Sequence, residues 1–389
     1  MKVAFCLENL VPSRGGAEQY VKDLSSLFCR EEHEVHIFTM RSVVAPEKNL
    51  KLHILRVPRR PKFLRALWFA LSCRRAVRRD NFAVIHSFGR TLGMDVFQPL
   101  GGSQMAGLIG NLRSIDNPLK RFFKVLCYIF SLRRLVYFLI EKLQMRQASL
   151  VVAISGMVKK DLIKYTRLGQ GKVRIVRNGV DLVKFHPDNR TRYREERRTK
   201  LGLKQEDILI LFVAHNFRLK GLRPLLFALR KLARRHPEIP FKLGVLGQGK
   251  TSTFQRLAEK LGVADRVIFI GLSADTAHYY AAADICVHPS FYDPSALVVL
   301  EAMASGIPVI TTDFCGTSEI ISEGVEGYVV KTPNNVTEMA GRILALSDPA
   351  HRREMGIRAR ARAEKAPYAR NMQAILGIHN EYCRPGPRS

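Results

Sequence analysis

The sequence lacks paired cysteines and any GxGxxG motif, and its acidic residues are few. Its seven cysteines lie far apart and include no CxxC pair, which argues against a zinc site and against a disulfide framework. Most of them stand in apolar runs, where cysteine behaves as a small hydrophobic residue. We therefore expect a reducing cytosol and no bound metal.

Long apolar runs are also missing. The most hydrophobic long stretch, 122–140, is interrupted by Lys124, Arg133 and Arg134, whereas a membrane-spanning helix needs about 20 apolar residues in a row. The chain starts with MKVAFCLENLVP, whose apolar run is too short for a signal peptide and predicts a strand instead. We expect a protein that lies on a membrane without crossing it.

Acidic residues number 34 against 63 lysines and arginines, which gives a formal net charge of +29. This charge favours a polyanionic partner, such as nucleic acid, an anionic membrane or a phosphorylated substrate. The aromatic residues lie in apolar runs and are not interleaved with the basic patches, so stacking platforms for bases are not evident. Nucleic-acid binding is a distant alternative, and we predict no nucleic-acid partner.

A chain of 389 residues exceeds what one hydrophobic core usually serves, so two domains are expected. Apolar strands alternate with amphipathic helices in the first half and again from residue 208, which predicts two α/β domains with parallel, doubly wound sheets. We place the first Rossmann-like domain at 1–182 and the second at 183–368. The charged stretch 188–204 resembles a linker or an exposed helix.

Ligands of such sheets bind beyond the carboxyl ends of the strands. Gly15 and Gly16 stand between the first strand and its helix, where a backbone without Cβ atoms can approach a phosphate; a plain tight turn is the alternative. Arg218 and Lys220 follow the strand 208–214, and two cations there can neutralise a diphosphate. Solvated surface cations are the alternative for this pair.

The segment HPSFYDPSALVVLE begins at His288. Its second proline suits the first turn of a helix predicted over 295–303. Asp293 and Glu301 have carboxylates that can accept hydrogen bonds from sugar hydroxyls, although Asp293 can equally be a simple helix cap. The helix start supplies candidate donor-binding amides, at Ser295, Ala296 and Leu297.

Two weaker predictions concern the first domain. His86 and Asp95 follow its fourth strand and are candidates for acceptor or sugar contacts, although a lone histidine is usually structural. Between 118 and 146, cations flank a wide apolar stripe, as in helices that lie on anionic lipids. Lys120, Arg121 and Lys124 are the membrane-facing candidates, and a buried core helix is the alternative.

Four segments carry a resemblance to a known family. They are Arg177-Asn178-Gly179-Val180-Asp181, the loop from Arg218 to Gly221, LGVADRVIFIGL and AAADICVHPSFYDPSALVVLEAMASGIPVITTDFCGTSEII. Together they resemble the retaining glycosyltransferases of family four, which have the glycosyltransferase B fold of two Rossmann-like domains facing across a crevice. The start of the chain and the region 87–95 are similar to the members that add glucose to a heptose of the lipopolysaccharide core.

The resemblance implies a role for each candidate residue. Arg218 and Lys220 would bind the donor diphosphate, Glu301 the ribose and Asp293 the transferred sugar, while the glycines approach the phosphates. Asp293 stands where the family has a glutamate, so its side chain is one methylene shorter. The first domain would bind the acceptor and the second the nucleotide sugar, and 369–389 would form a helix returning to the first domain and then a tail.

The expected activity is that of a retaining, metal-independent hexosyltransferase without a cofactor. It would move a hexose from a UDP-glucose-like nucleotide sugar to a lipid-linked glycan acceptor, such as lipopolysaccharide core, at the anionic inner face of the plasma membrane. We expect a cytoplasmic, peripherally associated enzyme. A sugar-nucleotide epimerase and a glucan synthase of the same fold are the alternatives, and an epimerase would need acid/base groups around the sugar that the sequence does not place.

Overall fold

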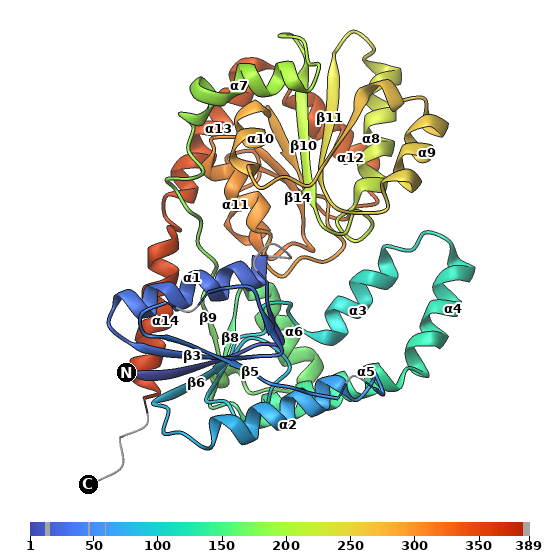
Figure 1. The fold of residues 1–389 in the computed structure, drawn as a ribbon. Coiled ribbons are helices and arrows are strands. Elements are labelled where there is room, and N and C mark those ends of the chain that lie inside the picture. Colours follow the sequence, from blue (N-terminus) through green and yellow to red (C-terminus); the bar gives the residue numbers. More distant parts are fainter. Residues whose placement is uncertain (12–15, 46, 59, 384–389) are drawn as a thin grey trace. The chain divides into compact units, whose positions relative to one another are not determined.

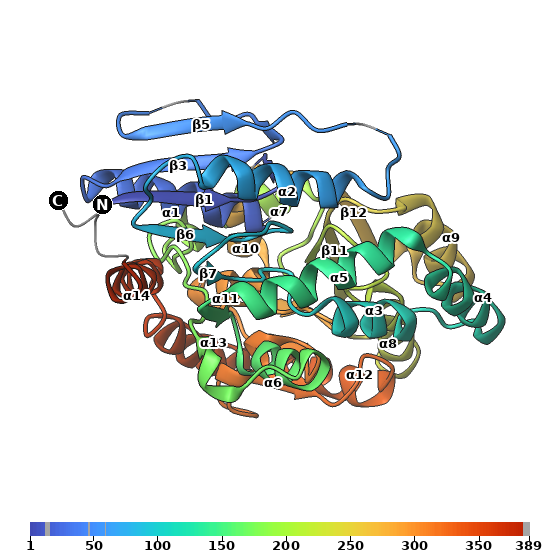
Figure 2. The same ribbon diagram turned by 90° about the horizontal axis from the view of Figure 1, so that it is seen from below.

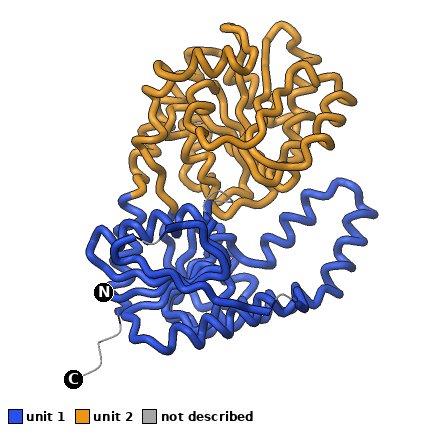
Figure 3. Tube along the Cα trace, viewed as in Figure 1, with its two compact units in different colours: residues 1–177, 369–389 blue, residues 178–368 orange. Residues whose placement is uncertain are grey.

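The computed structural model describes residues 1–11, 16–45, 47–58 and 60–383 (Figure 1). The chain divides into two compact units, Met1–Arg177 with Ala369–Ser389, and Asn178–Tyr368 (Figure 3). The boundary lies before the turn at Asn178, not at residue 182, because Val180 pairs with Pro367 of the second unit. Gly15 and the tail 384–389 lie outside the described residues.

The first unit contains a seven-stranded sheet in which all neighbours run parallel, in the order β5-β3-β1-β6-β7-β8-β9. Figure 2 shows the part of this order from β5 to β7. Val3, Ala4 and Phe5 of the central strand β1 are fully buried, as expected for a parallel sheet covered on both faces. The strands are β1 Lys2–Cys6, β3 Glu34–Thr39, β5 Leu50–Ile54, β6 Val84–Ser87, β7 Val96–Phe97, β8 Leu150–Ala153 and β9 Val173–Ile175. A separate two-stranded sheet joins β2 Asn9–Leu10 and β4 Arg41–Ser42.

The first unit also contains seven α-helices among its described residues. Ser155 caps one of them as its sequence position indicates, since its hydroxyl accepts a hydrogen bond from the Val158 amide at 3.2 Å. The helices are α1 Gly16–Arg30, α2 Arg65–Val77, α3 Gln104–Arg113, α4 Pro118–Ile129, α5 Leu132–Gln147, α6 Gly156–Thr166 and α14 Tyr368–Glu381.

Helix α14 packs on strands of the first unit, since the ring of His379 meets Phe5 of β1 edge to face. Ile375 and Ile378 are buried, and Glu381 forms a two-pronged ion pair with Arg174 of β9, with N–O distances of 2.6 and 2.8 Å. Segments far apart in the sequence thus share one core.

The second unit contains a six-stranded sheet, order β12-β11-β10-β13-β14-β15, also parallel between neighbours. Its strands are β10 Ile208–Ala214, β11 Phe241–Gly247, β12 Val267–Gly271, β13 Ile285–Val287, β14 Val309–Thr312 and β15 Gly327–Val330. Its helices are α7 Asn189–Lys200, α8 Leu222–Arg235, α9 Thr251–Leu261, α10 Thr276–Ala282, α11 Leu297–Ala304, α12 Val336–Ala345 and α13 Pro349–Ala363.

The central strand β10 shows why this sheet forms. Ile210 and Phe212 belong to one hydrophobic cluster and Leu209 and Leu211 to another, because successive side chains point to opposite faces of a strand. Both faces of the sheet are therefore covered, which matches the predicted doubly wound fold.

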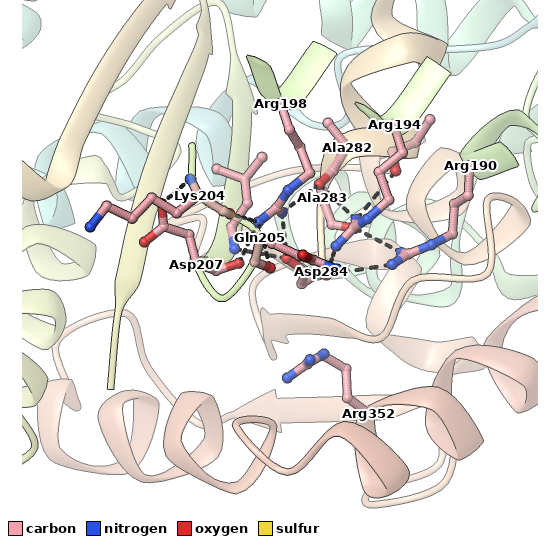
Figure 4. Close-up of polar contacts among 12 residues, drawn as sticks. Arg190, Arg194, Arg198, Lys204, Gln205, Asp207, Ala282, Ala283, Asp284 and Arg352 are labelled. Carbon is pink, nitrogen blue, oxygen red and sulfur yellow. Dashed lines mark hydrogen bonds and ion pairs between the residues drawn. The ribbon is translucent and has the colours of Figure 1, made fainter. Parts of the chain in front are cut away.

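Helix α7, from the charged stretch 188–204, is neither a linker nor fully exposed. Arg190, Arg194 and Arg198 recur every four residues and converge on Asp284, with N–O distances of 3.5, 2.7 and 3.1 Å (Figure 4). Their guanidinium groups also donate to backbone carbonyls at the end of α10, such as Ala282. These contacts fix α7 to the second unit.

The predicted helical region 118–146 is broken in two, since α4 ends at Ile129 and α5 starts at Leu132. Helix α4 is described throughout and none of its residues is buried, so the core-helix alternative is wrong for α4. It projects from the sheet of the first unit together with α3 and α5 (Figure 1). Helix α5 is different, because its Ile140 is fully buried.

Candidate donor site and family membership

The candidate site lies where the chain order of the second sheet reverses. The chain proceeds from β10 outward to β11 and β12 and then returns to the other side of β10 as β13. The loops that follow β10 and β13 therefore diverge, and in open α/β sheets ligands bind at this switch point, beyond the carboxyl ends of the strands.

The two loops are joined by backbone contacts. The Phe291 amide donates to the Leu219 carbonyl at 2.9 Å. Gly221 has φ +85°, and a Cβ atom there would lie 1.9 Å from the carbonyl oxygen of Pro289. Only glycine allows this close approach without a shift of the backbone.

The joined loops bring together two side chains singled out from the sequence. The Nζ atom of Lys220 lies 2.7 Å from Oδ2 of Asp293 and 3.2 Å from the Tyr292 carbonyl oxygen. Burial alone would raise the pKa of Asp293, but Lys220 and the hydrogen bond from His288 lower that pKa far below its usual value. Asp293 is therefore an anion held beside a cation.

Backbone contacts also fix Asp293. Its amide donates to the Phe314 carbonyl at 2.9 Å, and its own carbonyl accepts from the Gly316 amide at 2.8 Å. The Thr317 hydroxyl donates to the Ala296 carbonyl at 3.2 Å. The loop after β14 thus supports the loop after β13.

Helix α11 begins at Leu297, two residues later than predicted, with Ala296 at its N-cap. The backbone amides of Ser295, Ala296 and Leu297 donate no hydrogen bond to any residue in the described part of the chain. Free amides at a helix start favour an anionic ligand.

Glu301 lies within α11, as predicted. Its Oε2 accepts a hydrogen bond from the Tyr280 hydroxyl at 2.9 Å. Burial raises the pKa of Glu301, and the Tyr280 hydrogen bond and the charge of Lys184 offset only part of this shift. A half-buried carboxylate held in this way can accept hydrogen bonds from a diol.

Arg218 is exposed, and its side chain makes no hydrogen bond or ion pair with any residue that the structure describes. Gly16 begins α1 and is exposed, but it belongs to the first unit. The structure therefore joins Lys220 to Asp293 in the second unit and leaves the role of the glycines a prediction.

In the first unit, His86 is fully buried. Its Nδ1 lies 2.9 Å from Nε2 of His379 in α14, and its ring stacks on Phe88. Asp95 accepts a hydrogen bond from the Ile85 amide at 2.9 Å. Both side chains serve the packing of the unit, and His86 has no surface to offer a substrate.

Sequence reasoning assigned no role to His288. Its Nε2 lies 2.8 Å from Oδ2 of Asp293, so it is a direct partner of the predicted sugar-binding carboxylate. The sequence did carry a signal for this contact. His288 stands at the end of a predicted strand, five residues before Asp293, and the Pro-Ser turn between them folds the chain back.

Family comparisons agree with this arrangement. Residues 14–184 match the family described as Glycosyltransferase Family 4, and residues 193–362 match the family described as Glycosyl transferases group 1. The chain therefore carries one domain of each of these two glycosyltransferase families, and the predicted resemblance is confirmed.

Two curated relatives are similar to parts of the chain. The chain is 37% identical over 149 residues to the lipopolysaccharide glucosyltransferase WaaG of Escherichia coli strain K12, which is 38% of either chain. It is 29% identical over 244 residues to a D-inositol 3-phosphate glycosyltransferase of Nocardia farcinica, 61% of this chain and 53% of that one. These alignments span well under two thirds of either relative.

Solved structures cover more of the chain. The crystal structure of WaaG, described as a glycosyltransferase involved in lipopolysaccharide biosynthesis, covers 97% of this chain and 99% of its own with a TM-score of 0.79 at 24% identity. Anabaena Alr3699/HepE in complex with UDP and glucose gives a TM-score of 0.74 at 19% identity, covering 98% of this chain and 99% of that one. At these identities the likeness concerns the fold, and the predicted glycosyltransferase B class is confirmed.

Proposed function

We propose that the chain transfers a hexose from a UDP-glucose-like nucleotide sugar to a lipid-linked glycan, with lipopolysaccharide core as the first acceptor class to test. The observation that carries the donor half of this proposal is the contact between Lys220 and Asp293 at the switch point. The name of WaaG and the UDP and glucose bound to HepE support the choice of donor.

Each candidate site residue of the second unit has a task in the proposed reaction. Lys220 and Arg218 neutralise the charge that develops on the departing diphosphate, helped by the free amides at the start of α11. Glu301 accepts hydrogen bonds from the ribose and Asp293 from the hexose. Retention would follow from attack on the same face of the sugar, with the leaving phosphate as the base.

Replacing Lys220 with alanine tests the donor site. We expect kcat for transfer or slow donor hydrolysis to fall by about 10²–10³. The variant should fold, because no core is opened, but its melting temperature should fall because the largely buried Asp293 loses its cation. The measurement is a panel of UDP-glucose, UDP-galactose, UDP-N-acetylglucosamine and GDP-mannose, scored by turnover and thermal shift. Lys260→Ala, an exposed lysine of α9, is the matched control.

Unchanged turnover in Lys220→Ala would refute the assignment of the donor site. We also expect chelation by EDTA to leave turnover unchanged, because cationic side chains supply the charge that a metal would otherwise provide. Loss of turnover on chelation, with recovery on adding a divalent cation, would contradict metal independence.

For the acceptor side, we propose that α4 docks on an anionic membrane. Large apolar side chains of α4 and the start of α5 are more than half exposed, and their spacing places most of those in α4 on one face: Leu119, Phe122, Phe123, Ile129, Phe130, Leu132 and Leu135. Lys120, Arg121 and Lys124 are exposed beside them. Within the described residues, no helix is long and apolar enough to cross a bilayer.

Replacing Lys120, Arg121 and Lys124 together with glutamine tests the docking. We expect about a hundredfold weaker binding to vesicles containing anionic lipid, since each cation near such a surface adds to the attraction, and no effect on turnover with a soluble acceptor. The control replaces Arg230, Arg234 and Arg235 of α8, which removes the same charge elsewhere. Equal losses in both variants would show that net charge alone attracts the protein.

A further inference from the structure

His288 is fixed in place on every side. It follows β13, and its side chain is 2% exposed. Its amide donates to the Ile310 carbonyl at 2.8 Å, and its carbonyl accepts from the Thr311 hydroxyl at 3.0 Å. The ring lies nearly parallel to Phe212, with an interplanar angle of 22°.

The single N–H group of the His288 ring donates its hydrogen bond to Asp293. Burial lowers the pKa of His288, more than Asp293 raises it, so the ring is neutral and carries one N–H. A carboxylate can only accept, so the N–H is at Nε2, 2.8 Å from Oδ2 of Asp293. The Nδ1 atom is buried and has no partner among the described residues, an arrangement that is rare in folded proteins.

His288 and Lys220 both contact the same oxygen of Asp293. The recorded distances, 2.8 Å from His288 and 2.7 Å from Lys220, both end at Oδ2. Oδ1 accepts no hydrogen bond from any residue in the described ranges. Because the Asp293 backbone is also held at its amide and its carbonyl, the carboxylate offers one acceptor atom in one orientation.

We propose that His288 is a positioning residue that makes Asp293 selective for the donor sugar. By binding Oδ2, it leaves Oδ1 alone to accept from a hexose hydroxyl, and it prevents the short aspartate from rotating toward a hydroxyl in another position. The proposal rests on the donor site described above, and it assigns sugar selectivity to a side chain that itself touches no sugar.

Two amide replacements of His288 test whether the position of its hydrogen-bond donor matters, or only the polarity of the side chain. In His288→Gln the side-chain amide extends to where Nε2 lies, and in His288→Asn it reaches only the position of Nδ1. Both variants are polar and smaller than histidine. The measurements are kcat and KM with UDP-glucose and UDP-galactose, and the Kd of UDP by calorimetry.

We expect His288→Asn to lose about tenfold to a hundredfold in kcat with the preferred sugar, because small misplacements of a reacting group cost this much, and to lose most of its preference between the two sugars. His288→Gln should keep most of the wild-type kcat and most of the preference between the two sugars. The Kd of UDP should stay within about threefold in both variants, since UDP lacks the hexose.

The outcomes distinguish failure of the proposed function from failure of the positioning role of His288. If wild type turns over no nucleotide sugar, the proposed function fails and this inference fails with it. If wild type is active and His288→Asn keeps its sugar preference, His288 is a packing residue and the donor site stands. Equal losses in the two variants, with weakened UDP binding, would likewise overturn the positioning role. If His288→Asn does not fold, a His288→Gln variant that folds and loses the preference overturns it as well.

Discussion

Asp284 holds three arginines of α7 at once, and removing its charge should destabilise the second unit. Asp284 is 4% exposed and Arg198 is 7% exposed, so this pair is shielded from water. Asp284→Asn keeps the shape of the side chain and its contact with the Leu209 amide, 2.9 Å from Oδ2. The change removes the negative charge, and it also places an NH2 group where Oδ1 accepts a hydrogen bond from Arg194 at 2.7 Å (Figure 4).

The size of the effect follows from the burial of Arg198. Leaving one member of a buried ion pair without its partner costs about 3–5 kcal/mol. In a unit of this size, each kcal/mol lowers the melting temperature by about 2–4 °C. We therefore expect the transition of the second unit to fall by about 6–20 °C.

The effect should depend on pH in one direction. Burial alone would raise the pKa of Asp284, but Arg194, the Leu209 amide and Arg190 lower it below its usual value of 3.8. A depressed pKa means that the carboxylate stabilises the fold above pH 3.8 and that this contribution is lost as the pH falls further. The difference in melting temperature between wild type and Asp284→Asn should therefore become smaller as the pH falls below 3.8.

Differential scanning calorimetry is the suitable assay, because a chain with two units can melt in more than one step. Glu196→Gln is the control, since Glu196 lies on the same helix and pairs with Lys200 in solvent, where ion pairs contribute little. We expect no measurable shift for the control. A melting temperature for Asp284→Asn within about 1 °C of wild type would refute the reasoning.

Two further predictions concern the rest of the chain. Below about pH 6.5 the first unit should lose about 1.4 kcal/mol per pH unit and per histidine, because burial lowers the pKa of His86 and lowers that of His379 to about 3, so only the unfolded chain takes up these protons. Acid unfolding followed by circular dichroism should show a shallower slope in His379→Gln, and equal slopes would contradict this. Gly221→Ala should lower both stability and turnover, because its Cβ would meet the Pro289 carbonyl at 1.9 Å. Gly202→Ala, at φ +66° with nothing within 4 Å, should cost only about 1 kcal/mol, and similar losses in both variants would point to backbone strain alone.

Much of the fold was predictable, because long apolar strands and amphipathic helices carry a strong periodic signal. Strand β10 has the predicted limits, 208–214. Strand β7 was hard to predict, because it has only two residues, Val96 and Phe97, and its pairing comes from tertiary context. The break at Phe130 was hidden because residues 118–147 are rich in helix formers.

The candidate site was predictable in its residues but not in its geometry. The sequence indicated Lys220, Asp293 and Glu301 singly, and the topology brought Lys220 to Asp293. His288 and Asp284 were missed because their roles depend on partners that the sequence does not show to be close. His288 contacts Asp293 across a turn, and Asp284 contacts arginines of α7, far away in the sequence. The spacing of Arg190, Arg194 and Arg198 was a visible signal, since every fourth residue of a helix lies on one face.

The return of α14 to the first unit has a consequence for synthesis. The second unit, Asn178–Tyr368, is continuous in the sequence, whereas the first needs Ala369 onward to complete its core. Phe28 and His86 pack against His379, which a ribosome adds after the whole of the second unit. The unit that is translated first must therefore wait with part of its core uncovered, and the unit translated second can be the first to finish folding.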